Sequence, residues 1–220
     1  MASLEERYWD RHYAAGGVSG EGSVGAIRQW KWDQIRSIAG EVDDVVDVGC
    51  GDLSFWHDRL PPAYTGLDIS STIASKNRER HPEATFIVTN AAVPQVASGR
   101  IVLCMDMLFH IMDEETYRGI LANLGRYSRE WIFVYTWRSN PLVDQGIRRY
   151  VARKLFWQGR LPAAVRALKG SSTDYDYQTY RRFEDYASLI TDQGFSLVET
   201  RSEPAIERWG ALYVFRKQSH

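Results

Sequence analysis

The stretch Val45-Val46-Asp47-Val48-Gly49-Cys50-Gly51-Asp52-Leu53 decides the fold. Its β-branched apolar run indicates a buried strand, and two glycines follow that strand directly, before a helix expected from Ser54. Because glycine has no Cβ and accepts positive φ, the backbone of this turn can approach a ligand closely. A strand, a glycine turn and a helix in this order are typical of an α/β sheet that binds ligands at the carboxyl ends of its strands.

Outward from this turn, short apolar runs alternate with amphipathic stretches. Four further runs are rich in β-branched and aromatic residues, which favours strands at 64–68, 85–89, 101–105 and 131–135. Helices are expected over 71–80, opened by Ser70, and over 113–127, with Asp113 as the N-cap. Two later runs, 196–200 and 211–215, predict a closing antiparallel pair. The pattern therefore predicts a doubly wound, mostly parallel seven-stranded α/β sheet.

Length and composition indicate one compact domain with one insertion. The chain has 220 residues, 44% of them hydrophobic, and a formal net charge of −1. We expect an N-terminal lid and helix over 1–40, a core over 41–137 and 183–220, and a helical cap inserted after the fifth strand over 138–182. Basic residues in the insertion outnumber its three acidic residues, Asp144, Asp174 and Asp176. The overall charge gives no sign of a nucleic-acid or membrane partner, but the insertion is locally cationic.

The two cysteines and the N-terminus bear on the cellular compartment. Cys50 and Cys104 can form neither a disulfide framework nor a Cys/His zinc cluster, so no metal is expected. The N-terminal residues are too charged for a signal peptide, and no apolar run reaches the roughly 18 residues of a membrane-spanning helix. The expectation is a cytoplasmic protein.

Two carboxylates narrow the choice of ligand. Asp47 precedes the glycine turn, and Asp68 ends the second predicted strand 21 positions later, where an acid can accept both hydroxyls of a ribose. A dinucleotide dehydrogenase would normally show Gly-x-Gly-x-x-Gly, but here the place of the third glycine holds neither Gly nor Ala, and Asp47 and Asp52 would repel a pyrophosphate. A cationic, ribose-bearing ligand is favoured instead, and S-adenosylmethionine fits that description.

With these motifs the chain resembles the class I S-adenosylmethionine-dependent methyltransferases. The resemblance rests on Val-Asp-Val-Gly-Cys-Gly at 46–51, Gly-Leu-Asp-Ile-Ser at 66–70 and Cys-Met-Asp-Met-Leu-Phe-His at 104–110, and it covers about residues 40–135 and the closing strands. It implies a Rossmann-like fold and S-adenosylmethionine as the cofactor. The family's usual third glycine is Leu53 here, and the acid often found after the third strand is Asn90.

The resemblance also implies roles for individual residues. Gly49, Cys50 and Gly51 would pass the methionine part of the cofactor, and Asp47 would approach its ammonium group. Asp68 would hold the ribose hydroxyls. Ile69 would line one face of the adenine, and Asn90 and Ala91 would meet its edge. Met105 is also expected among the cofactor-binding residues.

The glycine-rich N-terminal segment is expected either to be a loose leader or to close the site as a lid. In the second case Trp9 would cover the cofactor, and Arg28 or Lys31 would reach its carboxylate. Asp106 and His110 follow the fourth strand, where the substrate would lie. His110 could take a proton from the methyl acceptor, but a sulfonium methyl donor can also react through positioning alone.

The acceptor is the least determined part of the prediction. Tyr135 and Trp137 leave the fifth strand toward the same crevice, and Arg148 and Arg149 of the insertion could clamp an anion. The expected activity is methylation of O or N on a small, anionic metabolite. The insertion could instead dock on a membrane or nucleic acid, shield the pocket or contact a second copy. The whole chain could also transfer another group, or be a non-catalytic cofactor-binding subunit. We expect a monomer or homodimer.

Overall fold

The computed structural model of the protein describes residues 3–57, 59–141 and 177–218. Their seven strands form one sheet in the order β3-β2-β1-β4-β5-β7-β6. The strands are β1 (Asp44–Val48), β2 (Ala63–Asp68), β3 (Thr85–Val88), β4 (Gly99–Met105), β5 (Ser128–Trp137), β6 (Phe195–Arg201) and β7 (Gly210–Lys217). Each of the seven predicted strands is present, so the α/β class and the strand number are confirmed.

The sheet is mixed, which corrects the expectation of a mostly parallel one. Four pairings, β1–β2, β1–β4, β2–β3 and β4–β5, are parallel. β7 is antiparallel to both of its neighbours, β5 and β6. The reason is the short connection from β6 to β7, which turns the chain back on itself and inserts β7 between β5 and β6.

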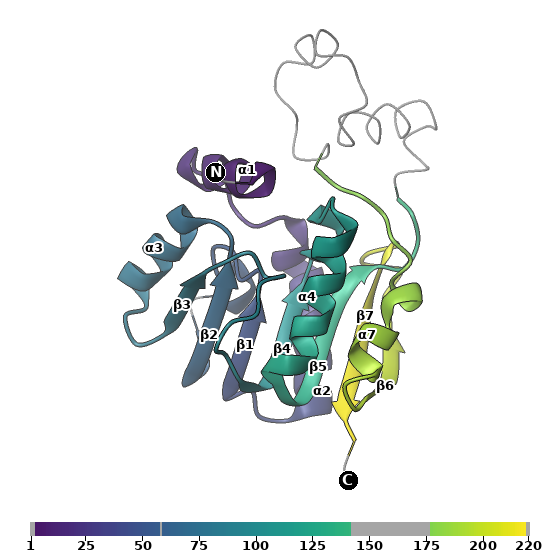
Figure 1. Ribbon diagram of the computed structural model, residues 1–220. Coiled ribbons are helices and arrows are strands. Elements are labelled where there is room, and N and C mark those ends of the chain that lie inside the picture. The colour runs from purple at the N-terminus through teal and green to yellow at the C-terminus, as the bar shows by residue number, and fades with distance from the viewer. Residues whose placement is uncertain (1–2, 58, 142–176, 219–220) are drawn as a thin grey trace, which may run out of the picture.

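Helices cover both faces of the sheet (Figure 1). They are α1 (Leu4–Ala14), α2 (Gly25–Ala39), α3 (Ser71–Arg80), α4 (Glu114–Tyr127) and the short α7 (Ser188–Thr191). Single turns of 3-10 helix occur at η1 (Glu21–Ser23), η2 (Ser54–Trp56), η3 (Leu108–His110) and η5 (Phe183–Tyr186). The predicted caps are confirmed, because the side chain of Ser70 accepts from the amide of Ile73 and that of Asp113 from the amide of Thr116.

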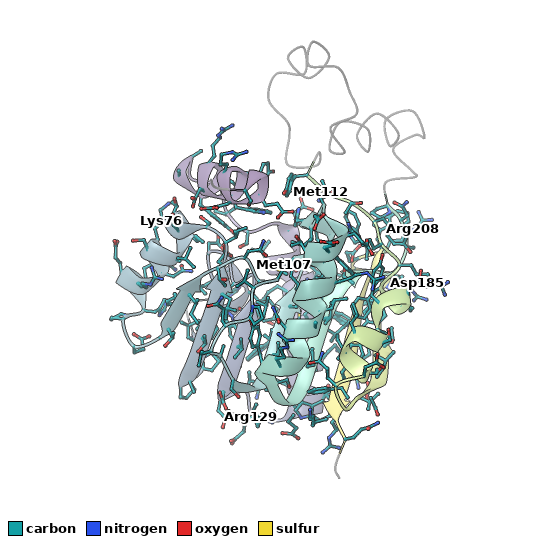
Figure 2. All side chains as sticks on the ribbon, in the orientation of Figure 1. Lys76, Met107, Met112, Arg129, Asp185 and Arg208 are labelled. Carbon is teal, nitrogen blue, oxygen red and sulfur yellow. The ribbon has the colours of Figure 1, made fainter. Side chains whose placement is uncertain are left out.

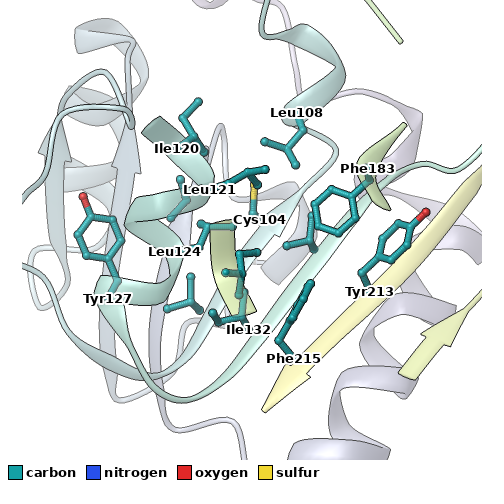
Figure 3. Close-up of a cluster of buried hydrophobic side chains, with 14 of the residues drawn as sticks. Cys104, Leu108, Ile120, Leu121, Leu124, Tyr127, Ile132, Phe183, Tyr213 and Phe215 are labelled. Atoms are coloured by element: carbon teal, nitrogen blue, oxygen red, sulfur yellow. The ribbon is translucent and has the colours of Figure 1, made fainter. Parts of the chain in front are cut away.

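Alternation along the strands divides the core into two layers. Val102 and Cys104 of β4 face α4 and α7, whereas Ile101 and Leu103 face α2 and α3. Figure 3 shows the first layer, in which Leu121 and Leu124 of α4 and rings from the carboxyl-terminal part of the chain, among them Phe183, surround Cys104. Both faces of the central strands are buried, so the carboxyl edge of the sheet is where the strands can present side chains to a ligand.

Two local expectations differ from the structure. The helix expected from Ser54 is a single 3-10 turn, because Leu53 (φ 64°) and His57 (φ 48°) take left-handed conformations on either side of it. The N-terminal segment, expected as a loose leader or as a lid, begins with the helix α1. Ser3 and Glu6 form a capping box at its start: the Ser3 hydroxyl accepts from the Glu6 amide, and the Glu6 carboxylate accepts from the Ser3 amide.

Residues 142–176, which form most of the expected insertion at 138–182, lie outside the described residues. Arg148 and Arg149 are among them.

Candidate functional site

A cavity of about 890 Å³ opens at the carboxyl ends of β1, β2, β4 and β5. β1 lies between β2 and β4, so successive connections leave it toward opposite halves of the sheet, and such a reversal point creates a crevice. In Figure 1, α1 lies above this edge of the sheet, and Figure 2 places Met107, just after β4, at the same edge. The sequence motifs after β1, β2 and β4 therefore meet at one cavity.

Two positions of the glycine turn, Gly49 and Gly51, require glycine because of their backbone conformation and their close neighbours. Gly49 has φ 80° and Gly51 has φ 54°. A Cβ on Gly49 would lie 2.5 Å from Sδ of Met107, and a Cβ on Gly51 would lie 2.6 Å from Oγ of Ser19. Both glycines line the cavity, so the turn presents bare backbone there.

Asp68 lies at the end of β2 and also lines the cavity. Its Oδ2 accepts a hydrogen bond from the amide of Gly51 (2.9 Å), and its Oδ1 accepts one from the amide of Ser70 (2.9 Å). Burial raises the pKa of Asp68, while these amides lower it. The carboxylate thus joins the glycine turn to the end of the neighbouring strand and presents acceptors beside it.

Most of the other residues expected near the cofactor also line the cavity. They are Trp9, Ile69, Asn90, Ala91 and Met105. The side-chain oxygen of Asn90 accepts from the amide of Ala92 (2.9 Å), which fixes the turn after β3. The placement of these side chains is what the sequence predicts, and their contacts with a ligand stay predictions.

Three expected cofactor residues are absent from the described cavity lining: Asp47, Arg28 and Cys50. Oδ2 of Asp47 accepts hydrogen bonds from Nε1 of Trp56 (2.7 Å) and from the hydroxyl of Tyr64 (2.8 Å). Its side chain points into the layer toward α2 rather than beyond the strand end, and burial raises its pKa to about 6. Asp47 is therefore held inside the core, and its expected contact with an ammonium group stays a prediction.

Arg28 and Cys50 also have their partners away from the described cavity lining. Nε of Arg28 donates to the carbonyl of Phe55 (2.6 Å), and its guanidinium lies 5.8 Å from the ring of Trp32. Cys50 is buried, and burial raises its pKa well above the usual range. Arg28 stabilises the segment after the glycine turn instead of reaching into the cavity.

α1 and the loop after it cover the cavity. Tyr8, Trp9, His12 and Tyr13 of α1 line it. Oδ1 of Asp10 accepts from the Ser70 hydroxyl (2.6 Å) and from the amide of Thr72 (3.0 Å) at the start of α3.

Two further hydrogen bonds hold this covering segment. Nζ of Lys76 donates to the carbonyl of Tyr13 (2.8 Å), and the amide of Ser19 donates to Oδ2 of Asp52 (2.9 Å). The N-terminal segment therefore lies where a lid is expected, fastened to α3 and to the glycine turn.

Asp106 and Lys31 form an ion pair beneath this segment. Oδ2 of Asp106 lies 2.5 Å from Nζ of Lys31, which also donates to the carbonyl of Gly22 (2.9 Å). The ammonium lies 3.7 Å from the centre of the Tyr135 ring. Burial lowers the pKa of Lys31, and Asp106 offsets part of that effect. Asp106 lines the cavity as expected, but its carboxylate is engaged by Lys31 rather than held ready as a base.

His110 lines the cavity at the end of η3. Its Nδ1 lies 2.7 Å from the carbonyl oxygen of Tyr177, and Trp9 packs edge-on against its ring at 5.0 Å. Because a carbonyl can only accept, Nδ1 carries the proton, so in the neutral form of the ring the lone pair is on Nε2. This tautomer is the one a general base needs if Nε2 meets the substrate.

The opposite side of the cavity is aromatic. We call it the β5–β7 wall; its residues are Phe109, Tyr135, Trp137, Glu207 and Trp209. Phe109 and Trp137 are stacked (4.4 Å, 9°). The Tyr135 hydroxyl donates to Oε2 of Glu207, and Oε1 of Glu207 accepts from the Trp209 amide (2.8 Å). Tyr135 and Trp137 are where the sequence places them.

Glu207, Trp209 and Phe109 were missed as site residues. The first two lie in the loop between β6 and β7, and they reach the cavity because β7 pairs with β5. Phe109 stands within a quoted motif, but nothing in its spacing indicates that it would stack on Trp137. Had the sheet order been predicted with β7 beside β5, the loop between β6 and β7 would have been placed at the cavity.

The described residues contain neither a metal-binding cluster nor a helix that could cross a membrane. They hold no group of three or more His, Cys, Asp or Glu side chains arranged to bind a metal ion. None of their helices has the length and apolar character needed to cross a membrane.

Comparison with known proteins identifies the fold. No family model and no curated protein matches the sequence. Among solved structures, magnesium protoporphyrin IX methyltransferase from Synechocystis PCC 6803, with bound S-adenosylhomocysteine, matches with a TM-score of 0.64 at 14% identity, over 97% of this chain and all of that one.

Two further structures match similarly. N-methyltransferase NodS from Bradyrhizobium japonicum WM9, in complex with S-adenosylhomocysteine, gives a TM-score of 0.63 at 14% identity over 99% of this chain and all of that one. Burkholderia thailandensis 1,6-didemethyltoxoflavin-N1-methyltransferase, with bound S-adenosylhomocysteine and 1,6-didemethyltoxoflavin, gives a TM-score of 0.61 at 14% identity. The match covers 97% of this chain and 87% of that one. The described chain has the class I methyltransferase fold.

Proposed function

We propose that this protein transfers a methyl group from S-adenosylmethionine to O or N of a small molecule. The observation that carries the proposal is the contact between Asp68 and Gly51 at the cavity floor. It joins the acid that a ribose requires to the bare glycine turn, at the reversal point of the sheet. The three matched structures are of methyltransferases, each bound to S-adenosylhomocysteine.

The residues present suit this cofactor. Asp68 offers carboxylate oxygens to ribose hydroxyls, and the turn at Gly49 and Gly51 leaves room for an extended chain where any side chain would collide. Ile69 and Asn90 stand at the ends of β2 and β3, where the adenine would lie. The cavity lining holds five carboxylates, which favours a ligand with positive groups; they are Glu5, Glu21, Asp68, Asp106 and Glu207.

The chain's own residues would bind, cover and orient the reactants. S-adenosylmethionine would supply an electrophilic methyl group with a neutral thioether as its leaving group. Tyr8, Trp9 and Tyr13 of α1 would exclude water above it. Nε2 of His110 would accept the proton that the acceptor loses. Asp106, held by Lys31, would shape the floor without taking a proton.

The predicted anionic acceptor would be bound by Arg148 and Arg149, which lie outside the described residues. The described lining contains one Arg or Lys, which is Arg208. A cytoplasmic monomer or homodimer that binds no nucleic acid also stays a prediction.

Binding of S-adenosylhomocysteine tests the proposed cofactor site. Calorimetric titration with S-adenosylhomocysteine should give saturable binding, and Asp68→Asn should weaken it at least tenfold because a charged acceptor is lost. Asp192→Asn, an exposed carboxylate at the end of α7, is the matched control and should leave binding unchanged. Equal affinities in wild type and Asp68→Asn would overturn the proposed site.

Two alternatives share the fold. The same cofactor could serve another group transfer, or the chain could be a non-catalytic subunit that contacts a partner through its insertion. Release of S-adenosylhomocysteine in the presence of a metabolite panel would distinguish methyl transfer from both, since neither alternative produces it.

A further inference from the structure

The charge and the aromatic surfaces at the β5–β7 wall indicate which acceptor the cavity fits. We infer that the methyl acceptor is an arylalkyl amine, an aromatic ring that carries its amine on an alkyl chain, and that it enters as a cation. This inference rests on the proposed function and concerns only the chemical class of the acceptor. It differs from the anionic acceptor that the basic insertion suggests.

The aromatic residues of the wall supply surfaces for both the ring and the ammonium group of such an acceptor. Phe109 and Trp137 form one continuous stacked surface. The guanidinium of Arg208 already lies 4.5 Å from the centre of the Trp209 ring, and the ammonium of Lys31 lies 3.7 Å from that of Tyr135. The faces of these rings attract positive charge because of their quadrupole. Two rings of the wall thus already meet cations within the protein.

Glu207 of this wall and Asp106 beside it carry more negative charge than the single positive charge of Lys31 offsets. Lys31 is ion-paired with Asp106 and attracts Glu207 more weakly, so it offsets one of the two negative charges. Both hydrogen-bond donors to Glu207, the Tyr135 hydroxyl and the Trp209 amide, are neutral. Burial raises the pKa of Tyr135 above its usual range, so its hydroxyl stays a donor.

Arg208 does not make this wall a binding site for an anion. Its side chain is exposed, where solvent screens its charge, and its guanidinium stacks on Trp209. A bidentate clamp would need guanidinium groups directed at one point. An anion at this wall would instead meet Glu207 and Asp106, and like charges in a covered cavity repel strongly.

An ammonium group must lose a proton before its nitrogen can accept a methyl group. One N–H bond breaks, its electron pair stays on nitrogen, and the proton passes to a base. Nε2 of His110 is the lone-pair nitrogen of the ring that lines this cavity, because Nδ1 donates to Tyr177. A site that binds the cation beside this histidine can therefore bind the amine and, with the ring in its neutral form, activate it.

The test uses three probes that differ in one group: 2-phenylethylamine, 2-phenylethanol and 3-phenylpropionate. Each is titrated calorimetrically into the full-length protein saturated with S-adenosylhomocysteine. We expect the amine to bind at least tenfold more tightly than the propionate, with the alcohol between them. Glu207→Gln, which keeps the size of the side chain and removes its charge, should reduce this preference about tenfold.

Glu203→Gln is the matched control, a carboxylate in the same loop that is not among the described lining residues. It should leave the preference unchanged. Propionate binding as tight as amine binding would overturn the inference in favour of an anionic acceptor, as would a preference unaffected by Glu207→Gln. Absence of binding by all three probes to the saturated protein would also overturn it. Failure to bind S-adenosylhomocysteine would instead overturn the proposed function.

Discussion

Nζ of Lys31 lies 2.5 Å from Oδ2 of Asp106, with the Lys31 side chain fully buried and that of Asp106 20% exposed. The pair joins α2 to the residue that follows β4, and Asp106 has a positive φ of 56°. Through the carbonyl of Gly22 the same ammonium also holds the segment above the cavity. One buried cation therefore fixes the floor and part of the cover of the candidate site.

Lys31→Met should lower the free energy of unfolding by about 3 kcal/mol, because it leaves the Asp106 charge without its partner in a largely buried place. Urea denaturation measures the change. Lys31→Met combined with Asp106→Asn should recover at least half of the loss, since asparagine tolerates the left-handed backbone and carries no charge. Strictly additive losses would show that the two side chains do not stabilise each other.

Asp47→Asn should change how stability depends on pH. The pKa of Asp47 is raised to about 6 in the folded protein from an ordinary value near 3.8, because burial disfavours its ionised form. The protonated carboxyl thus favours folding, and its contribution is full below about pH 4 and is lost as the pH rises through about 6. An asparagine oxygen can accept from Trp56 and Tyr64 at every pH.

Urea denaturation of wild type and Asp47→Asn between pH 4 and 7 tests this. The variant should gain stability relative to wild type as the pH rises, by an amount of the order of 3 kcal/mol. Asp192→Asn should follow wild type across the range. Parallel profiles for Asp47→Asn and wild type would show that Asp47 has an ordinary pKa in the folded protein.

Trp9→Ala should weaken binding of S-adenosylhomocysteine about fivefold or more, because the indole closes the cavity and packs on His110 at 5.0 Å. Calorimetry measures the dissociation constant. Arg11→Ala changes an exposed residue of the same helix and should leave it unaltered. An unchanged constant in Trp9→Ala would remove α1 from the binding site while leaving the glycine turn in place.

The strands and the residues at their ends were predictable from the sequence because local signals specify them. The apolar run before Gly49 and the caps at Ser70 and Asp113 each follow from a few neighbouring residues. Asp68, Ile69 and Asn90 then reach the cavity because parallel strands end at one edge. Predicting where these three residues lie relative to one another requires only the order of the strands in the sheet.

The direction of a side chain and contacts between distant segments were not predictable in this way. Asp47 is at the strand position that resembles the family's motif, but Trp56 and Tyr64 draw its carboxylate into the core. Lys31 finds Asp106 across 75 positions of sequence, and Glu207 reaches Tyr135 across 72. Such pairings depend on how α2 and β7 pack against β5, which no local pattern encodes.

His110→Asn should separate binding from proton transfer. The amide nitrogen of asparagine can replace Nδ1 as the donor to the Tyr177 carbonyl, so the local fold should be kept, but no nitrogen lone pair remains to take a proton. With an acceptor identified by release of S-adenosylhomocysteine, kcat should fall at least a hundredfold while the dissociation constant of S-adenosylhomocysteine stays within twofold of wild type. The acidic limb of the pH–rate profile, where a histidine base becomes protonated, should disappear. If kcat and that limb both persist, positioning alone suffices, and the imidazole packs against Trp9 without accepting a proton.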